Sequence, residues 1–112
     1  MIPQIIGTKK STSYRACLRY CKERDISFQE RDLREKPFSP VELDRVAAAC
    51  GGHEELIDTT GKAFQARGLA WMEYDTRTEL LEHPELLRHP IVRTDNGVVI
   101  APDNATLDAL FR

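Results

Sequence analysis

The sequence lacks the features that mark membrane-spanning and secreted proteins. No apolar run approaches the roughly 18 residues of a membrane-spanning helix. The opening residues, MIPQIIGTKK, lack the basic segment and long apolar core of a secretory signal peptide. Cysteine occurs only at Cys17, Cys21 and Cys50, an odd number without the spacing of a disulfide framework. We therefore expect a cytoplasmic protein with reduced thiols and without a membrane span.

An excess of charge of one sign is also absent. The 16 Lys and Arg residues nearly balance the 18 Asp and Glu residues, and the formal net charge is −2. This balance argues against the strongly basic surface of many nucleic-acid-binding proteins, so we expect no direct nucleic-acid partner. A length of 112 residues fits one domain with its own hydrophobic core, and we expect that domain to span residues 1–112.

Apolar periodicity predicts four short strands and several helices, in the order β-α-β, a helical insert, and β-β-α. The predicted strands are residues 2–6, 26–33, 89–93 and 97–101, and the main predicted helices are residues 12–24, 40–50, 76–83 and 102–111. A helical turn at 53–57 and a short helix within 59–69 complete the insert, which spans about residues 39–83. The sequence therefore predicts an α/β domain with a mixed four-stranded sheet, the arrangement of the thioredoxin fold.

Capping and turn residues support these boundaries. The segment from Ser39 to Glu42 is a capping box with proline at the first helical position. The segment from Thr76 to Glu79 reads as a second capping box. The pair Asn96-Gly97 is a strong signal for a tight turn between two antiparallel strands.

The loop after the first predicted strand is the first candidate site. Its Ser/Thr-rich turn leads into a helix, for which Ser11 or Thr12 is a natural N-cap. Backbone N–H groups gather at such a helix start and favour small oxyanions. We therefore consider Lys9, Lys10, Ser11, Thr12 and Ser13 as candidate anion-binding residues. Ser11 would be a nucleophile only with an adjacent base, and no sequence spacing links a histidine to it.

The cysteines offer a second candidate chemistry. Cys17 and Cys21 are four residues apart on one predicted helix, so both thiols lie on one face. They could form a displaced redox pair or bind a metal, but no second Cys/His pair with zinc spacing accompanies them. We favour burial of both as small apolar residues, expect no metal site, and take Cys50 as structural or as a stray thiol.

Three large side chains precede the helix predicted at residue 76. Trp71, Met72 and Tyr74 could form a partner-binding patch, because aromatic residues are enriched at binding hot spots. Packing of the insert on the sheet is the alternative, and we favour it here.

Several segments together resemble the arsenate reductase ArsC/Spx family. The pieces YRA, ERDL and PFSPVEL, at residues 14–16, 30–33 and 37–43, resemble the family's first helix, second strand and following helix start. TTGKAFQARGL resembles its middle segment, and LLEHPELLRHPIVRTDNGVVIA resembles its third strand and hairpin. The resemblance covers nearly the whole chain in order. It implies the thioredoxin-like fold, and it implies that Pro90 is a cis proline close to Ser11.

The same resemblance locates departures from the family pattern. Ser11 stands at the position of the reductases' cysteine, and Tyr14 stands at the second cysteine of the Spx-type Cys-x-x-Cys pair. The positions of three oxyanion-binding arginines correspond to Asp58, His89 and Ala101. Arg88 and Arg93 lie near the second of these positions, so with His89 they join the candidate anion-binding residues.

The resemblance leaves three functions open. The first is a family member without catalysis, of oxidoreductase ancestry; residual activity would imply glutathione and glutaredoxin. The second is an Spx-like binding module that acts through a protein partner such as RNA polymerase. The third is a thiol enzyme that uses Cys17 or Cys21.

Overall fold

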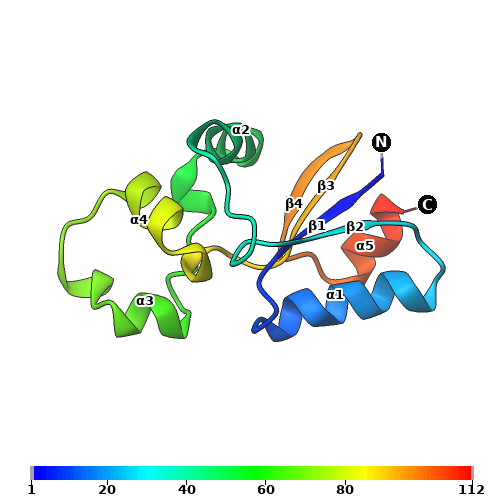
Figure 1. Ribbon diagram of the computed structural model, residues 1–112, viewed down its shortest axis with the longest axis horizontal. Helices are drawn as coiled ribbons and strands as arrows, with labels where there is room; N and C mark the ends of the chain where they lie inside the picture. Colours follow the sequence, from blue (N-terminus) through cyan, green and yellow to red (C-terminus); the bar gives the residue numbers. More distant parts are fainter. Residues whose placement is uncertain (1, 112) are drawn as a thin grey trace.

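A computed structural model of the protein describes residues 2–111 (Figure 1). The four strands are β1 (Gln4–Gly7), β2 (Gln29–Asp32), β3 (Ile91–Thr94) and β4 (Gly97–Ile100). The α-helices are α1 (Thr12–Glu23), α2 (Pro40–Cys50), α3 (Lys62–Ala66), α4 (Thr76–Glu82) and α5 (Asn104–Leu110). Three short 3-10 helices, η1 (His53–Glu55), η2 (Leu69–Trp71) and η3 (Pro84–Leu86), lie within or at the end of the insert.

The strands form one mixed sheet in the order β2-β1-β3-β4. Strands β1 and β2 are parallel, whereas β3 is antiparallel to both β1 and β4. This topology confirms the predicted α/β thioredoxin-like arrangement. Helices α1 and α5 lie side by side against one face of the sheet, and the insert extends the molecule beyond the end of the strands (Figure 1).

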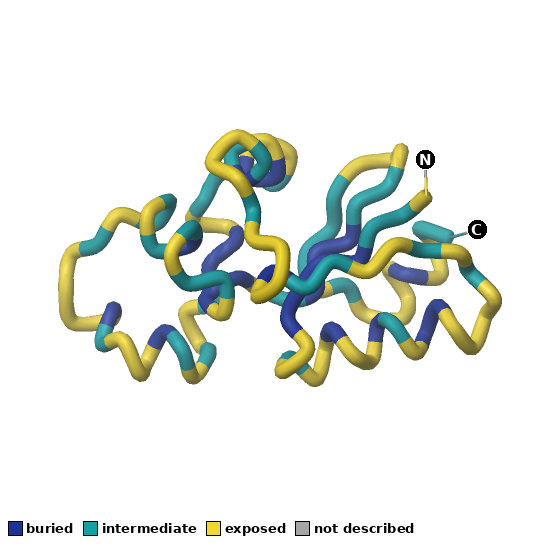
Figure 2. The backbone as a smooth tube through the Cα atoms, in the orientation of Figure 1, coloured by how far each residue is buried: buried dark blue, intermediate teal, exposed yellow. Residues whose placement is uncertain are grey.

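Alternation along the strands sends apolar side chains to both faces of the sheet. Ile5 and Val92 pack with α1 and α5, whereas Ile6 and Ile91 pack with α2 and the insert. The buried segments run continuously from the sheet into the insert, while the outer turns of α1 and the outer loops are exposed (Figure 2). Both faces of this small sheet are therefore covered.

Side-chain caps fix where the main helices begin. The Ser11 Oγ accepts a hydrogen bond from the Tyr14 N–H at 3.2 Å, and the predicted capping box of α2 is present in full. One predicted cap is wrong by one residue: Asp75, rather than Thr76, is the N-cap of α4, and its carboxylate accepts from the Thr78 N–H at 3.0 Å.

Two other predictions need correction. Strand β2 covers only four residues, because Ile26 and Phe28 pack against the α1 side of the core before pairing with β1 begins. The prediction that Trp71 and Met72 pack on the sheet is wrong, since they are 92% and 51% exposed. Tyr74 does pack inward, with its ring edge-to-face against Phe64 at 6.0 Å between centroids. Within residues 2–111, no helix is long and apolar enough to cross a membrane.

Candidate functional site

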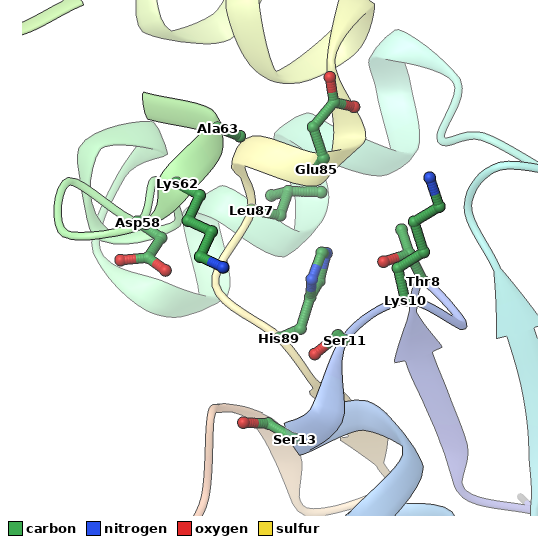
Figure 3. A pocket seen from close by; sticks show the side chains of 11 residues that line it. Thr8, Lys10, Ser11, Ser13, Asp58, Lys62, Ala63, Glu85, Leu87 and His89 are labelled. Carbon is green, nitrogen blue, oxygen red and sulfur yellow. The ribbon is translucent and has the colours of Figure 1, made fainter. Parts of the chain in front are cut away.

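A cleft of about 410 Å³ opens beside the loop that follows β1 (Figure 3). It forms where the sheet end meets the insert, so side chains far apart in sequence face one another. Its lining residues are Thr8, Lys10, Ser11, Ser13, Asp58, Gly61, Lys62, Ala63, Glu85, Leu87 and His89. Of the candidate anion-binding residues, the structure thus brings Lys10, Ser11, Ser13 and His89 together.

Ser11 is held at the start of α1 by hydrogen bonds on both sides. Its backbone N–H donates to the Thr8 carbonyl at 2.9 Å, and its hydroxyl oxygen accepts from the Tyr14 N–H. The N–H groups of Thr12 and Ser13 have no intrahelical acceptor because they belong to the first turn. The loop therefore combines a capped helix start with exposed hydroxyl groups at the cleft.

Tyr14 faces the core rather than the cleft. Its side chain is 0% exposed and covers Gly7 so closely that a Cβ there would lie 2.6 Å from the Tyr14 Cδ1. Burial, reinforced by the nearby carboxylates of Glu30 and Asp32, raises the pKa of Tyr14 to about 12. Its buried hydroxyl has no hydrogen-bond partner within residues 2–111. Tyr14 therefore fills space between α1 and β1.

His89 lies in the cleft between Ser11 and Leu87 (Figure 3). Burial lowers its pKa, and a hydrogen bond to the backbone of Pro84 opposes that shift more weakly. The Nε2 atom is buried and makes no hydrogen bond with any part of the described chain. Burial therefore favours the neutral form of the imidazole, and its Nε2 atom at the cleft wall has no partner within residues 2–111.

The charges that line the cleft are of both signs. Lys10 and Lys62 contribute ammonium groups, whereas Asp58 and Glu85 contribute carboxylates. The Asp58 carboxylate accepts hydrogen bonds from the Thr60 N–H at 3.1 Å and its hydroxyl at 2.9 Å. Lys62 and Glu85 were not predicted as site residues. In the sequence, Lys62 could have been found only through its position. It follows Asp58 by four residues and lies in the segment that resembles the family's middle segment.

Comparisons with known proteins identify relatives by sequence and solved structures of the same fold. The chain is 32% identical over 85 residues to the global transcriptional regulator Spx of Bacillus subtilis, a match that covers 72% of this chain and 65% of the regulator. It is 30% identical over 94 residues to the regulator of the same name from Streptococcus mutans, covering 80% of this chain and 68% of that protein. The chain belongs to the ArsC/Spx family. No family model matches it.

Solved structures of ArsC-type proteins share the fold along almost the full length of the chain. An ArsC family related protein from Bacteroides fragilis superposes with a TM-score of 0.80 at 16% identity, covering 98% of both chains. The arsenate reductase from Vibrio cholerae superposes with a TM-score of 0.78 at 20% identity, covering 96% of this chain and 97% of the reductase. At these identities the likeness shows the thioredoxin-like fold.

The ArsC/Spx resemblance also led to predictions for Pro90 and for three further positions, and the structure shows where each of these residues lies. The peptide bond between His89 and Pro90 is cis, as the resemblance implied. Ile91 pairs with Ile6, so Pro90 lies beside Gly7 at the entry to the Ser11 loop. Asp58 and His89, which the resemblance predicts to stand at two of the family's arginine positions, both line the cleft, whereas Ala101 does not.

The other four candidates point away from the cleft or lie outside it. Lys9 pairs with Glu35 at 3.6 Å, and Thr12 is exposed and accepts from Arg15 at 3.5 Å. Arg88 donates to the Glu55 carbonyl at 3.3 Å. Arg93 pairs with Gln4, at the opposite end of β1 from Ser11. The anion-binding role of the candidate set stays a prediction, but these four are not part of the cleft.

None of the cysteines lines this cleft. Cys17 and Cys21 are 4% and 0% exposed within the α1 side of the core, as favoured from the sequence. Burial raises the pKa of Cys17 to about 12 and also raises the pKa of Cys21. Cys50, half-buried at the end of α2, has its pKa raised by burial as well. Within residues 2–111, no group of three or more His, Cys, Asp or Glu side chains is placed to hold a metal ion.

Proposed function

We propose that this ArsC/Spx protein has no thiol chemistry at the family's active-site position and acts by binding. The observation that carries the proposal is the loop after β1. The hydroxyl of Ser11 is engaged as a helix cap and Tyr14 lies inside the core, and the resemblance predicts these two residues at the family's cysteine positions. A serine hydroxyl cannot take part in thiol–disulfide exchange, because that reaction requires a thiolate.

The chemistry of the cleft supports the same proposal. A reductase site for an oxyanion benefits from concentrated positive charge, yet Asp58 and Glu85 offset Lys10 and Lys62 here. Burial lowers the pKa of His89, which disfavours a positive charge on its imidazole. Glutathione and glutaredoxin would be needed only by a thiol enzyme, and this proposal assigns neither to the protein.

A second candidate function, that of a regulator, specifies what the protein binds. The two regulators described above, at 32% and 30% identity, are named as global transcriptional regulators, which favours a regulator over a reductase. On this candidate the chain works in the cytoplasm through a protein partner, and the family resemblance points to RNA polymerase. Its test is direct binding to purified RNA polymerase, and an absence of binding would remove this candidate.

The primary test is arsenate reduction with glutathione and glutaredoxin, with a family reductase as the positive control. We expect no turnover above the level without protein, because the cleft holds no thiol. Arsenate-dependent turnover that is lost in Ser11→Ala and kept in Ser13→Ala would overturn the proposal. Ser13 is the matched control because it places another hydroxyl on the same cleft.

A further inference from the structure

We propose that Trp71 and Met72 form a docking surface for a protein partner with an apolar pocket and a rim of Lys and Arg residues. The inference deepens the proposed binding function, on which it rests, by naming the surface that makes contact. This surface lies in the segment between α3 and α4, at the far end of the insert from α1 (Figure 1). It is separate from the Ser11 cleft.

The two side chains are exposed on a well-anchored backbone. Trp71 is 92% exposed and Met72 is 51% exposed, while the preceding Leu69 is 1% exposed. The N–H of Trp71 donates to the Gly68 carbonyl at 3.1 Å, and the N–H of Met72 donates to the Leu69 carbonyl at 3.4 Å. With Tyr74 packed inward on the other side, the turn presents both side chains outward. Figure 2 shows most of this segment as exposed.

An exposed tryptophan beside an exposed methionine suits a partner surface with a pocket. Tryptophan buries a large apolar area on contact and is among the residues most enriched at binding hot spots. Methionine adapts its flexible side chain to an irregular surface. Residues 70–73 are all exposed, between the buried Leu69 and the half-buried Tyr74, so Trp71 lies outside the protein's own core.

The charged side chains around the turn indicate which charge the partner should carry at the edge of its pocket. Arg67 is bound by both carboxylate oxygens of Glu79, at 2.8 and 3.1 Å. Arg77 is bound in the same way by Asp44, at 2.8 and 3.2 Å. Both arginines are therefore neutralised by their own acidic partners. Glu73 is exposed and forms no ion pair or hydrogen bond within the described chain.

The free charge beside Trp71 is thus negative, and a complementary partner is basic. The same charge disfavours nucleic-acid phosphates and anionic lipids, which it would repel. A second copy of the chain offers exposed Arg15, Arg19 and Lys22 on α1. We assign the surface to another protein, and contact with a second copy is an outcome that the test below would detect.

The test measures binding of purified RNA polymerase, the partner that the second candidate names, to the full chain and its variants. We expect Trp71→Ala to weaken binding by about tenfold or more, as for a hot-spot residue. Glu73→Lys should weaken binding at low salt and reduce its salt dependence. Val41→Ala is the matched control, because Val41 is another exposed apolar residue, at 59%, and should leave binding unchanged. Polymerase binding that is equal in wild type and Trp71→Ala would overturn the docking surface and leave the binding function standing.

A lack of polymerase binding would reject that partner, and a crosslinking experiment then decides on the surface. A photoreactive benzoylphenylalanine is placed at position 71 or at position 41 in cells that make the protein natively. Support requires a protein crosslinked only from position 71, whose purified form binds wild type and loses binding to Trp71→Ala and Glu73→Lys. The absence of a crosslink specific to position 71, a crosslink to a second copy, or binding to phosphatidylglycerol vesicles through Trp71 would overturn the proposal.

Discussion

Ser11 and Tyr14, which the resemblance predicts to stand at the family's two cysteine positions, play physically different roles in this structure. Serine keeps the capping role that a residue at the start of α1 needs, because its oxygen accepts the Tyr14 N–H. Tyrosine instead adds a large side chain that only glycine at position 7 can accommodate. The Gly7–Tyr14 contact therefore makes position 14 part of the core packing. A single cysteine substitution, at position 11 or at position 14, would not create a Cys-x-x-Cys pair.

At this residue scale the thiol reactivities are predictable. We expect Cys17 and Cys21 to be unreactive toward a disulfide reagent at pH 7 in the folded protein, because burial raises the pKa of each thiol. Denaturant should expose all three cysteines. In Ser11→Cys one further thiol should react fastest, since a helix N-terminus lowers a cysteine pKa from about 8.5 into the range of roughly 3.5–7.5.

Two controls make this titration decisive. Ser27→Cys adds a thiol at an exposed serine outside any helix start, and it should react more slowly than Ser11→Cys. Cys50→Ser removes the half-buried thiol, so any remaining native reaction belongs to Cys17 or Cys21. Rapid reaction of either in that variant would revive the third function, a thiol enzyme that uses the α1 cysteines.

At the scale of elements, α2 is joined to its neighbours by two sets of charged hydrogen bonds. Arg31 of β2 donates to both carboxylate oxygens of Glu42, at 2.6 and 3.0 Å, while Ser39 and Glu42 form the capping box. Two residues further on, Asp44 accepts from Arg77 of α4 and pairs with His53 of η1 at 2.9 Å. Helix α2 is thus connected to the sheet by Glu42 and to the insert by Asp44.

These links predict a loss of stability in acid. Hydrogen bonds from Arg31 lower the pKa of Glu42 to about 2, and those from Arg77 and His53 lower the pKa of Asp44 to about 2. Because both values are below those of an unfolded chain, the stabilisation is present above about pH 4.5 and is lost as the pH falls toward about 2. Urea unfolding between pH 7 and pH 3 should show the free energy of unfolding falling over this window.

Substitution separates this effect from general acid unfolding. Glu42→Gln should flatten the dependence of stability on pH below about pH 5, because an amide has no proton to gain. Glu23→Gln, at an exposed position with no ion pair within residues 2–111, should leave the slope unchanged. Equal slopes in wild type and Glu42→Gln would show that the Arg31–Glu42 pair does not contribute.

At the scale of the whole molecule, the fold was more predictable than the site because local signals determine the elements. The cap at Ser39, the Asn96-Gly97 turn and the apolar strands are all readable within a few residues, and each predicts its element, although β2 is shorter than predicted. The cleft instead depends on how the insert docks against the loop after β1. No local pattern places Lys62 and Glu85 opposite Ser11, and none reveals that Arg93 lies at the far end of β1.

The same limit explains the error at Trp71. A tryptophan between two apolar residues predicts burial from composition alone, yet Leu69 and Tyr74 already fill the inward positions of this turn. Whether the third large side chain turns inward depends on the space left by Phe64 and the rest of the insert core. That space is a property of the assembled molecule and not of the segment.

An exposed sole tryptophan gives the whole molecule an unusual unfolding signature. The chain has one tryptophan, and it is 92% exposed in the folded state. Urea unfolding should therefore produce a cooperative transition in far-UV circular dichroism with almost no shift in the position of the tryptophan emission maximum. A domain of this size is expected to unfold in a single cooperative transition.

A relocated indole is the matched control for this prediction. In Trp71→Phe/Tyr74→Trp the only tryptophan sits at a position that packs against Phe64 and the insert side of the core. Its emission should shift to longer wavelength on unfolding, with the same midpoint as circular dichroism. A large red shift of the wild-type emission would mean that Trp71 is covered in the folded protein in solution. The indole would then be unavailable to a partner. This result would contradict both the exposure of the turn and the docking surface proposed on it.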